Sequence, residues 1–501
     1  MKRNGKQPII LAIDQGTTGT KAVLLRADLK VLAEASREFP QHFPKAGWVE
    51  HDLDEIHASV RGAVHEALGK AKVAGTKIAA LGITNQRETT VIWDRRTGKP
   101  IHPAIVWQDR RTAEQCAELK RRSLEPLFRR KTGLVLDPYF SGTKAAWILE
   151  NVRGARSAAK AGHLLFGTID TYLVWRLTGG AAHVTDISNA SRTLFMDLRS
   201  GAWSDDLTGA LGVPQSMLPE IRDNDSVFGL SRNAGFLPDG IPIASVIGDQ
   251  QSALFGQACF AAGEAKCTYG TGAFLVLNTG DRIVSSKQGL LSTAAWKLRG
   301  RATYALEGST FVAGAIVQWL RDGLGIIRSS SEVEALARSV STSDGVVLVP
   351  ALTGLGAPHW DPDARGLLSG ITRGTTRAHI ARAALEGIAF QIHDLVRAME
   401  RDLGKRVRTL KVDGGASLNA LLMQFQADVL GTRVIRPRIA STTALGTALL
   451  AGLTTGIFSS QSSIERVWKE EARFSPVMST RESARRCSHW AEAVERAKSE
   501  T

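Results

Sequence analysis

The stretch Leu11-Ala-Ile-Asp-Gln-Gly-Thr-Thr-Gly-Thr-Lys-Ala-Val-Leu-Leu25 has the form of a strand, a turn rich in glycine and threonine, and a second strand. About half a chain later, Cys267-Thr-Tyr-Gly-Thr-Gly-Ala-Phe-Leu-Val-Leu277 repeats this form. Two such hairpins, one in each half, predict a duplicated two-domain plan with a cleft between the domains. Because glycine turns are common, two unrelated hairpins are the alternative interpretation.

Strand-like and helix-like patterns alternate along all 501 residues, which is typical of an α/β protein with largely buried sheets. This length exceeds one typical hydrophobic core, so we expect two domains, residues 1–257 and 258–501, with the junction near 256–263. Apolar residues at helical spacing predict helices over about 56–68 and 377–399. The charged stretch from about Ser479 predicts a peripheral C-terminal helix.

The composition, 43% hydrophobic and 22% charged, is that of an ordinary globular protein. A formal net charge of +14 allows either a nucleic acid or anionic small molecules as partners. The densest basic stretch, 120–131, is interrupted by apolar residues, and we interpret it as the solvated face of a helix. No nucleic-acid-binding motif accompanies it, so we expect no nucleic-acid partner.

The cysteines never form a Cys-x-x-Cys pair, which favours reduced thiols in a cytoplasmic protein over disulfides or a zinc site. The four are Cys116, Cys259, Cys267 and Cys487. The apolar run 8–13 ends at Asp14 and is too short for a signal peptide, so it predicts a first buried strand. No run approaches the roughly 18 apolar residues of a membrane span, and we expect no membrane insertion.

A cluster of hydrogen-bonding side chains follows the apolar run 78–83, in the sequence Gly82-Ile-Thr-Asn-Gln-Arg-Glu-Thr89. The tip of a buried strand is where α/β proteins bind ligands. Arg87 is a permanent donor and Glu88 an acceptor, a combination that suits a ligand with several hydroxyls. Neighbours on a strand point to opposite faces, so both can serve one ligand only if the backbone turns there. The alternative is an ordinary ion pair at a surface strand end.

The first turn, Asp14-Gln-Gly-Thr-Thr-Gly-Thr-Lys21, can bind an anion. Its glycines let backbone N–H groups approach a ligand closely, and Lys21 adds charge. Asp14 can hold a hydrated Mg2+, an ion that prefers a few carboxylates and retains several waters. A tight hairpin with a polar tip is the alternative.

Two further glycine sites occur in the second half, at 268–272 and 412–419. Two glycine loops facing each other would hold a nucleotide tail between the domains. Close approach at Gly414 and Gly415 would admit a purine ring, with Asn419 placed to hydrogen-bond it. On its own, an Asp-Gly-Gly sequence is usually a plain strand-to-helix turn.

The segment Ile247-Gly-Asp-Gln-Gln-Ser252 places Asp249 where a strand gives way to a helix. A carboxylate at such a corner can accept a proton from a substrate hydroxyl. Its alternative role is a helix N-cap. The sequence contains no Walker-type phosphate loop, no Gly-x-Gly-x-x-Gly after a strand, no Gly-x-Ser-x-Gly and no His-x-x-x-His pair, which excludes several other chemistries.

Taken together, these motifs resemble the FGGY family of sugar and polyol kinases, within the actin-like ATPase superfamily, and most closely its members that phosphorylate glycerol. The match spans almost the whole chain and includes the segments 44–52, 104–108, 137–144, 164–170, 307–322, 354–361 and 443–446. The resemblance implies two actin-like (ribonuclease H-like) α/β domains with an active-site cleft between them. It also implies transfer of the γ-phosphoryl group of ATP to glycerol, the first step of glycerol catabolism, in a cytoplasmic homodimer or homotetramer.

The resemblance implies a role for three sets of residues. The glycerol site would comprise Arg87, Glu88, Trp107, Tyr139, Asp249, Gln250 and Phe274, with Asp249 as general base and the Trp107 and Phe274 rings on the carbon faces. The ATP site would comprise Thr17, Thr18, Lys21, Thr271, Gly314, Gln318, Gly415 and Asn419. Asp14 would hold Mg2+ through water.

The chain departs from the family pattern in two places. Members that act on glycerol usually carry Ser-Ser-Arg where this chain has Gly19-Thr-Lys21. Lysine keeps the charge but loses the planar guanidinium, so the phosphate geometry is expected to differ. The segment 236–240 lacks the basic residues with which some members bind a sugar bisphosphate, so we expect that regulation to be absent or different. The alternatives are a kinase for another small polyol or ketose and a non-catalytic, nucleotide-dependent regulator.

Overall fold

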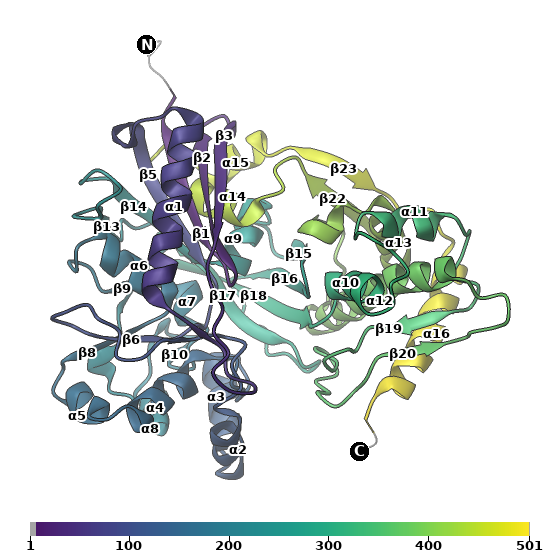
Figure 1. Cartoon of the computed structure of the whole chain (residues 1–501), viewed down its shortest axis with the longest axis horizontal. Helices are drawn as coiled ribbons and strands as arrows, with labels where there is room; N and C mark the ends of the chain where they lie inside the picture. Colours follow the sequence, from purple (N-terminus) through teal and green to yellow (C-terminus); the bar gives the residue numbers. More distant parts are fainter. Residues whose placement is uncertain (1–6, 500–501) are drawn as a thin grey trace.

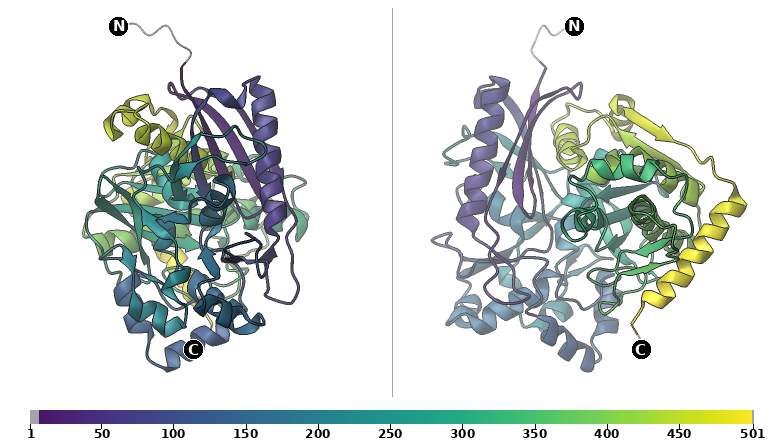
Figure 2. Two further views of the ribbon diagram at one scale, coloured as in Figure 1. Left: turned by 90° about the vertical axis from the view of Figure 1, so that its left-hand side faces the viewer. Right: turned by 45° about the vertical axis from the view of Figure 1, so that its right-hand side comes forward.

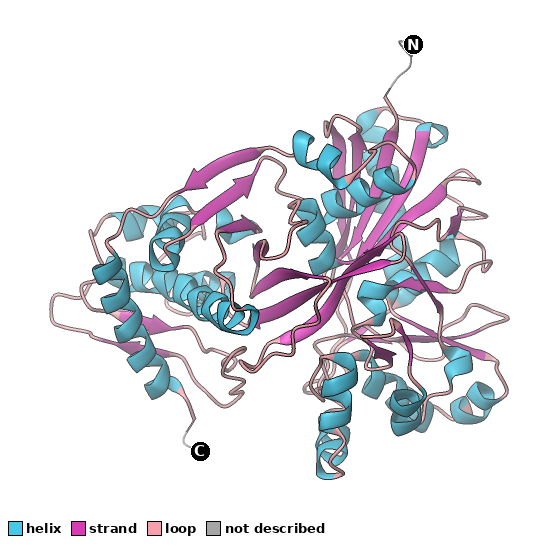
Figure 3. Cartoon of the chain, turned by 180° about the vertical axis from the view of Figure 1, so that it is seen from behind, coloured by secondary structure: helices cyan, strands magenta, loops and turns pink. Residues whose placement is uncertain are grey.

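The computed structural model describes residues 7–499 of the chain. It contains two large mixed sheets, one of six strands and one of seven, which are surrounded by helices (Figures 1 and 3). The expected two-domain α/β class is therefore confirmed.

The first sheet begins with the hairpin expected from residues 11–25. Strand β1 pairs antiparallel with β2, and β2 with β3, whereas β1, β5 and β14 run parallel to one another. The central strands are apolar and buried on both faces, as parallel strands usually are. In spatial order the strands are β13 (Gly229–Leu230), β14 (Pro242–Gly248), β5 (Ile78–Asn85), β1 (Ile9–Gln15), β2 (Gly19–Arg26) and β3 (Val31–Glu38).

The second sheet repeats this plan. Strand β15 pairs antiparallel with β16, as expected for the second hairpin, and parallel with β21, which in turn is parallel to β22. Both glycine-threonine sequences thus form the leading hairpin of a sheet, so the echo in the sequence is structural. In spatial order the strands are β17 (Leu291–Leu298), β18 (Arg301–Thr310), β16 (Ala273–Gly280), β15 (Ala265–Tyr269), β21 (Thr409–Asp413), β22 (Arg433–Pro437) and β23 (Glu470–Phe474).

The two expected helices are present as α1 (Leu53–Ala71) and α12 (Arg377–Leu403). Asp52 caps α1 by accepting from the backbone N–H groups of Asp54 and Glu55, and Thr376 forms a capping box at the start of α12. The remaining helices of the first half are α2 (Ala113–Arg121), α3 (Glu125–Thr132), α4 (Ser141–Asn151), α5 (Ala155–Lys160), α6 (Ile169–Leu177), α7 (Ile187–Ala190), α8 (Asp205–Leu211) and α9 (Asp249–Gly256). Those of the second half are α10 (Gly314–Asp322), α11 (Glu332–Arg338), α13 (Ala420–Leu430), α14 (Thr442–Thr454), α15 (Gln461–Val467) and α16 (Thr480–Ala497).

Short strand pairs complete the fold around the first sheet and beside α12. They are β4 (Glu50–His51) with β7 (Ala104–Ile105), β6 (Val91–Asp94) with β8 (Leu164–Gly167), β9 (Val184–Asp186) with β12 (Glu220–Arg222), β10 (Met196–Asp197) with β11 (Ala202–Trp203), and β19 (Val347–Val349) with β20 (Leu367–Ser369).

Helices α9 and α14 join the two halves by crossing closely. Apolar residues of α14 share a core with β1, β5 and β14, and Thr447 donates to the Ile83 carbonyl at 3.0 Å. A Cβ atom on Gly446 would lie 1.8 Å from the Ser252 carbonyl oxygen, so only glycine permits this approach. A helix from the second half thereby packs directly under the strands that carry the polar cluster at residues 84–89.

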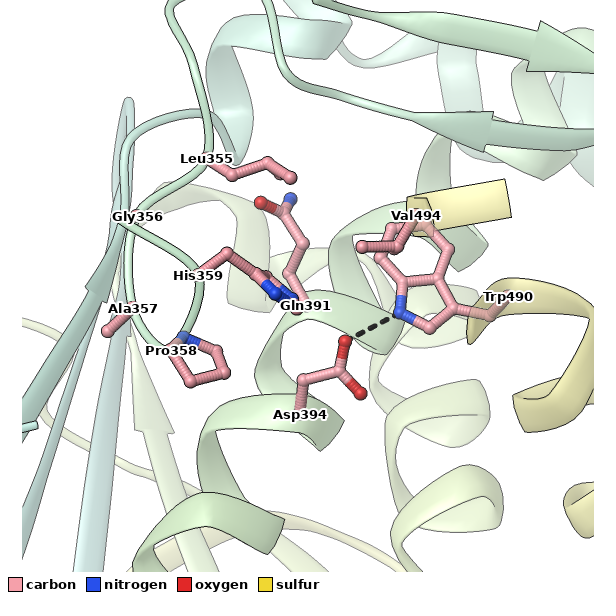
Figure 4. Close-up of a pocket in the computed structure, with 9 residues that line it drawn as sticks. All are labelled: Leu355, Gly356, Ala357, Pro358, His359, Gln391, Asp394, Trp490 and Val494. Atoms are coloured by element: carbon pink, nitrogen blue, oxygen red, sulfur yellow. Dashed lines mark hydrogen bonds between the residues drawn. The ribbon is translucent and has the colours of Figure 1, made fainter. Parts of the chain in front are cut away.

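Helix α16 lies along the outside of the second half, so the expected peripheral helix is confirmed (Figure 2). It is nevertheless firmly docked. Trp490 is buried and stacks on Phe390 with ring centroids 5.2 Å apart. Its indole N–H donates to Asp394 at 2.7 Å (Figure 4).

The single basic helix expected over 120–131 is wrong. The stretch is divided between α2 and α3, because Ser123 adopts a left-handed φ of 59° between them. Phe128 and Thr132 form the buried side of α3. All four cysteines are free thiols. In residues 7–499, no helix is long and apolar enough to cross a membrane.

Candidate active site

The backbone turns immediately after β5, as a shared role for Arg87 and Glu88 requires. Thr89 N–H donates to the Arg87 carbonyl at 2.7 Å, and Glu88 between them has a φ of 62°. This is the geometry of a γ-turn with positive φ, a rare and strained conformation. Both side chains are only 2% exposed, so the alternative of a surface ion pair is wrong.

Arg87 and Glu88 belong to a buried network that reaches into the second half. The Arg87 guanidinium contacts both carboxylate oxygens of Glu307 on β18, at 2.5 and 2.9 Å. Arg192 contacts Glu88 at 2.5 Å and Glu307 at 3.1 Å. Neither Arg192 nor Glu307 was expected at the site from the sequence. Glu307 opens one of the segments that resemble the family but had no expected role, Arg192 lies in none of them, and the partners of both lie far along the chain.

Mutual compensation keeps this network charged. Burial alone would raise the pKa of Glu307, but Arg192 and Arg87 outweigh it and lower that pKa to about 2. Burial opposes the charged form of Arg87 as well, yet Glu307 and Glu88 raise its pKa well above the ordinary value. Glu307 and Arg87 are therefore held in their ionic forms by groups from both halves, whereas burial raises the pKa of Glu88 despite the nearby Arg87 and Arg192.

Asp249 is the first residue of α9 and faces this pair. Its Oδ1 lies 3.1 Å from Arg87 Nε, and its carboxylate accepts from the Gln250 backbone at 2.7 Å and the Gln250 amide at 3.1 Å. Gly248, not Asp249, is the N-cap of the helix, so the capping alternative is wrong. The Asp249 side chain is 29% exposed, which leaves it accessible to a substrate.

Gln250 links Asp249 to a buried lysine. Its amide oxygen accepts from Lys266 Nζ at 2.5 Å, and Lys266 also donates to Thr268 at 2.9 Å. Burial lowers the pKa of Lys266, which the nearby Asp413 and Asp249 oppose. Gln250 therefore connects Lys266, on the second sheet, to the Asp249 carboxylate at the start of α9 through hydrogen bonds.

Three aromatic rings lie beside these polar groups. Trp107 packs edge-on against Tyr139 at 5.5 Å and against Phe274 of β16 at 6.5 Å between ring centroids. The Tyr139 hydroxyl accepts from Arg87 at 3.4 Å. Lys144 holds the Tyr139 loop by donating to three successive carbonyls, at 2.6, 2.7 and 3.0 Å. The structure thus brings together all seven residues expected at the glycerol site.

The first glycine loop lies next to this cluster. Thr17 accepts from the Trp107 indole N–H at 2.9 Å, and Thr18 pairs through its carbonyl with the Phe39 N–H. Lys21 stands opposite Asp14 across the hairpin, and its Nζ donates to Ser441, the N-cap of α14, at 3.1 Å. The loop and its lysine therefore face the junction with the second half.

The second glycine loop joins β15 to β16 and contacts the start of α10. Gly314 N–H donates to the Gly270 carbonyl at 2.9 Å, and the Thr271 carbonyl accepts from Ala313 at 2.7 Å. Gln318 is exposed one turn further along α10. Thr271 and Gly314 are thus brought together, whereas no side-chain hydrogen bond of Gln318 is present within residues 7–499.

The third glycine site follows β21 and packs against the second. A Cβ atom on Gly414, which has a φ of 86°, would lie 2.4 Å from the Tyr269 carbonyl oxygen, so this turn requires glycine. Gly415 is exposed at the start of a 3-10 helix, Gly415–Leu418. Asn419 is the N-cap of α13 and uses its side-chain oxygen on the Leu422 N–H at 2.9 Å, so its amide NH2 is the group left for a ligand.

Asp14 is the residue expected from the sequence to hold a metal ion through water. Burial and the nearby Asp249 carboxylate raise its pKa to about 7. Within residues 7–499, no group of three or more His, Cys, Asp or Glu side chains could hold a metal. A hydrated Mg2+ needs only one or two carboxylates, and it would relieve both the desolvation of Asp14 and its repulsion by Asp249, so these residues fit such an ion.

Comparisons with known proteins agree with this geometry. The models of the FGGY family of carbohydrate kinases match residues 9–256 (N-terminal domain) and 265–455 (C-terminal domain). A glycerol kinase of Myxococcus xanthus is 58% identical over 98% of this chain and 100% of its own length, and one of Alkalilimnicola ehrlichii is 57% identical over 97% and 98%. The crystal structure of Plasmodium falciparum glycerol kinase with ADP is 38% identical, with a TM-score of 0.93 over 99% of both chains.

Proposed function

We propose that this chain, which belongs to the FGGY family of carbohydrate kinases, transfers the γ-phosphoryl group of ATP to glycerol and yields sn-glycerol 3-phosphate and ADP. The observation that carries the proposal is the contact of Asp249 with the buried Arg87–Glu88 pair, at 3.1 Å from Arg87 Nε. This places a carboxylate base beside a group of fixed donors and acceptors suited to a polyol. The relatives named glycerol kinase, 57% and 58% identical over almost the whole chain, supply the substrate.

In this proposal, residues of the first half, together with Phe274 of the second half, bind and activate glycerol. Arg87 donates to its hydroxyls and Glu88 accepts from them, while the Trp107 and Phe274 rings cover its carbon atoms. Asp249 accepts the proton of the attacking hydroxyl as the oxygen–phosphorus bond forms. Because phosphoryl transfer requires mainly alignment and charge stabilisation, the rigidity of the buried network is an essential part of the mechanism.

The nucleotide is proposed to lie between the halves. Thr17, Thr18 and Lys21 would contact its phosphates from one side, and Thr271 from the other. The residues proposed to hold the rest of the nucleotide are Gly314, Gln318, Gly415 and Asn419. We assign the glycerol site and first phosphate loop to a domain of residues 1–257, and the second phosphate loop and adenine site to residues 258–501. The limits of the matching family models, 9–256 and 265–455, support this division.

We propose Mg2+ as the metal of the reaction, held by Asp14 through water. When bound, it supplies positive charge to the phosphates of ATP. Lys21, on the neighbouring strand, would add a second positive charge beside the phosphates. Its hydrogen bond to Ser441 holds it at the junction of the two halves.

The test is a phosphorylation assay with ATP and Mg2+ over a panel of polyols and ketoses, read out as ADP release. We expect glycerol to give the highest kcat/KM, and analogues that lack one hydroxyl to be strongly rejected, because they leave buried polar groups unpaired. Preference for a four- or five-carbon substrate would refute glycerol as the substrate. If no compound in the panel caused ADP release, the result would favour a non-catalytic regulator.

Three expectations remain predictions: a homodimeric or homotetrameric assembly, a cytoplasmic location and the lack of a nucleic-acid partner. Light scattering on the purified protein tests the first. The family resemblance supports the homodimeric or homotetrameric assembly, and a monomer at micromolar concentration would contradict it.

A further inference from the structure

A cavity lies away from the proposed active site, between α3, the residues that follow β10 and the loop that leads to β17 (these elements are placed in Figure 1). Its volume is about 350 Å³, at the lower end of the range for small-molecule sites. Three arginines line it: Arg129, Arg130 and Arg199. The cavity receives residues from both halves of the chain.

No carboxylate lies within 4.0 Å of these guanidinium groups among residues 7–499. The acidic side chains nearby have other partners. Lys131 lies 2.7 Å from Asp206 and 3.7 Å from Asp197, and Asp402 accepts from Ser286 at 2.5 Å. The pKa of Asp206 is lowered mainly by Lys131 and also by Arg130, so Arg130 has a carboxylate at longer range. Among residues 7–499, none of the three guanidinium groups is paired directly with a carboxylate, an arrangement that attracts anions.

The wall of the cavity also offers apolar surface. This surface is formed by Pro126, Leu198, Ile283 and Leu290. Ser285 adds a hydroxyl group to the lining. A purely electrostatic patch for free inorganic ions would not need these carbons. An occupant with a carbon body and a charged group would use both kinds of surface.

The backbone around the cavity is held in place before any ligand binds. Leu198 N–H donates to the Lys131 carbonyl at 2.7 Å, and Ser292 N–H donates to the Gly133 carbonyl at 3.0 Å. These bonds tie α3 to the end of β10 on one side and to β17 on the other. A ligand bound here would pay little to order the backbone, which favours affinity.

We propose that this arginine cavity binds a small phosphorylated metabolite of about sugar-phosphate size. Guanidinium groups match phosphate oxygens through paired N–H donors, and the apolar wall accepts the carbon skeleton. The site is separate from the residues proposed for glycerol and ATP. Because its walls come from both halves, its occupant links them.

Isothermal titration calorimetry at low ionic strength tests the proposal without relying on catalysis. The probes are glucose 6-phosphate, inorganic pyrophosphate, which lacks a carbon body, and citrate, which lacks phosphate. The variants are the double change Arg129→Gln/Arg199→Gln and, as a matched control, Arg153→Gln, an exposed arginine outside the cavity. The changed side chains are all exposed, so we expect unaltered thermal unfolding midpoints.

We expect saturable binding of glucose 6-phosphate that weakens at least about tenfold in the double variant and is unchanged in the control, since two charge-assisted contacts are lost. Lack of saturable binding, or equal binding by the double variant, would overturn the proposal. Tighter binding of pyrophosphate or citrate than of the sugar phosphate would overturn the proposed ligand class. If the wild-type protein had no glycerol kinase activity, the proposed function would be refuted, but the binding measured here would still support the proposed site.

Discussion

The substitution Glu307→Gln tests whether the buried network positions Arg87 and Glu88, the pair proposed to bind glycerol. Glu307 balances two guanidinium groups, which it contacts at 2.5, 2.9 and 3.1 Å. Glutamine keeps the size of the side chain but removes its charge. Arg87 and Arg192 would then share Glu88 and the partly exposed Asp249 as counter-charges, and their mutual repulsion would be less compensated.

The structure sets the size of the effect. Lowering the Glu307 pKa from 4.5 to about 2 corresponds to roughly 3 kcal/mol of stabilisation. Breaking a buried ion pair from one side costs about 3–5 kcal/mol, which agrees. Because the folded-state pKa is the lower one, this contribution is present above pH 4.5 and is lost as the pH falls toward 2.

At pH 7 we therefore expect Glu307→Gln to lower the thermal unfolding midpoint by roughly 3–6 °C, and to raise the KM for glycerol. The control is Glu114→Gln, which removes an 81% exposed carboxylate from a surface pair with Arg121 and should shift the midpoint by little. Differential scanning calorimetry and steady-state kinetics measure the two effects. A variant with wild-type stability and wild-type KM would refute the reasoning that this network positions Arg87.

Three further predictions follow from the same geometry. Asp249→Asn should retain glycerol binding, measured by calorimetry, while kcat falls by about 10²–10⁴, and near-normal turnover would exclude Asp249 as the base. Without Mg2+, a raised Asp14 pKa means that the native state holds the proton longer than the unfolded state, so stability should fall as the pH rises from about 4 to about 7. Asp14→Asn should remove this slope and also the rise in unfolding midpoint that Mg2+ gives the wild-type protein; persistence of both would count against the metal assignment. Gly446→Ala should destabilise the protein by about 3 kcal/mol or more, as judged by urea unfolding, because its Cβ would lie 1.8 Å from a carbonyl oxygen, whereas Gly69→Ala, with open space around it on α1, should be neutral or stabilising.

Local sequence patterns were sufficient to predict the leading hairpin of each large sheet and two of the main helices. The two glycine-threonine hairpins, the apolar run of β5 and the 3.6-residue spacing in α1 and α12 each depend on residues close together in the chain. The prediction of one helix over the basic stretch 120–131 was wrong because its pattern fits one helix, whereas a single residue with a left-handed backbone conformation, Ser123, divides the stretch into two helices. The packing of α14 under the first sheet could not be read from periodicity, since its residues are apolar or small on every side.

The candidate site was only partly predictable for a related reason. Arg87, Glu88 and Asp249 stand at the ends of apolar strands, where a polar residue is conspicuous. Arg192 and Glu307 carry no such local sign, and their contacts span 104, 115 and 220 residues of sequence. What makes them part of the site is charge balance in a buried volume, which exists only once the two halves are assembled.

That charge balance also bears on what the site can bind. The buried groups in direct contact beside the proposed glycerol site are two cations, Arg87 and Arg192, and two anions, Glu88 and Glu307, so their charges balance. A substrate with a net charge would leave one of these groups, or itself, without compensation, and an uncompensated buried charge costs several kcal/mol. A neutral polyol imposes no such cost, because its hydroxyls add donors and acceptors without changing the net charge. The phosphates of ATP carry the negative charge of the reaction, and the residues proposed to meet them, Lys21 and the glycine loops, stand outside the balanced set. The division between a neutral, charge-balanced substrate site and a separate anion-binding region is the electrostatic arrangement that a kinase for an uncharged alcohol requires.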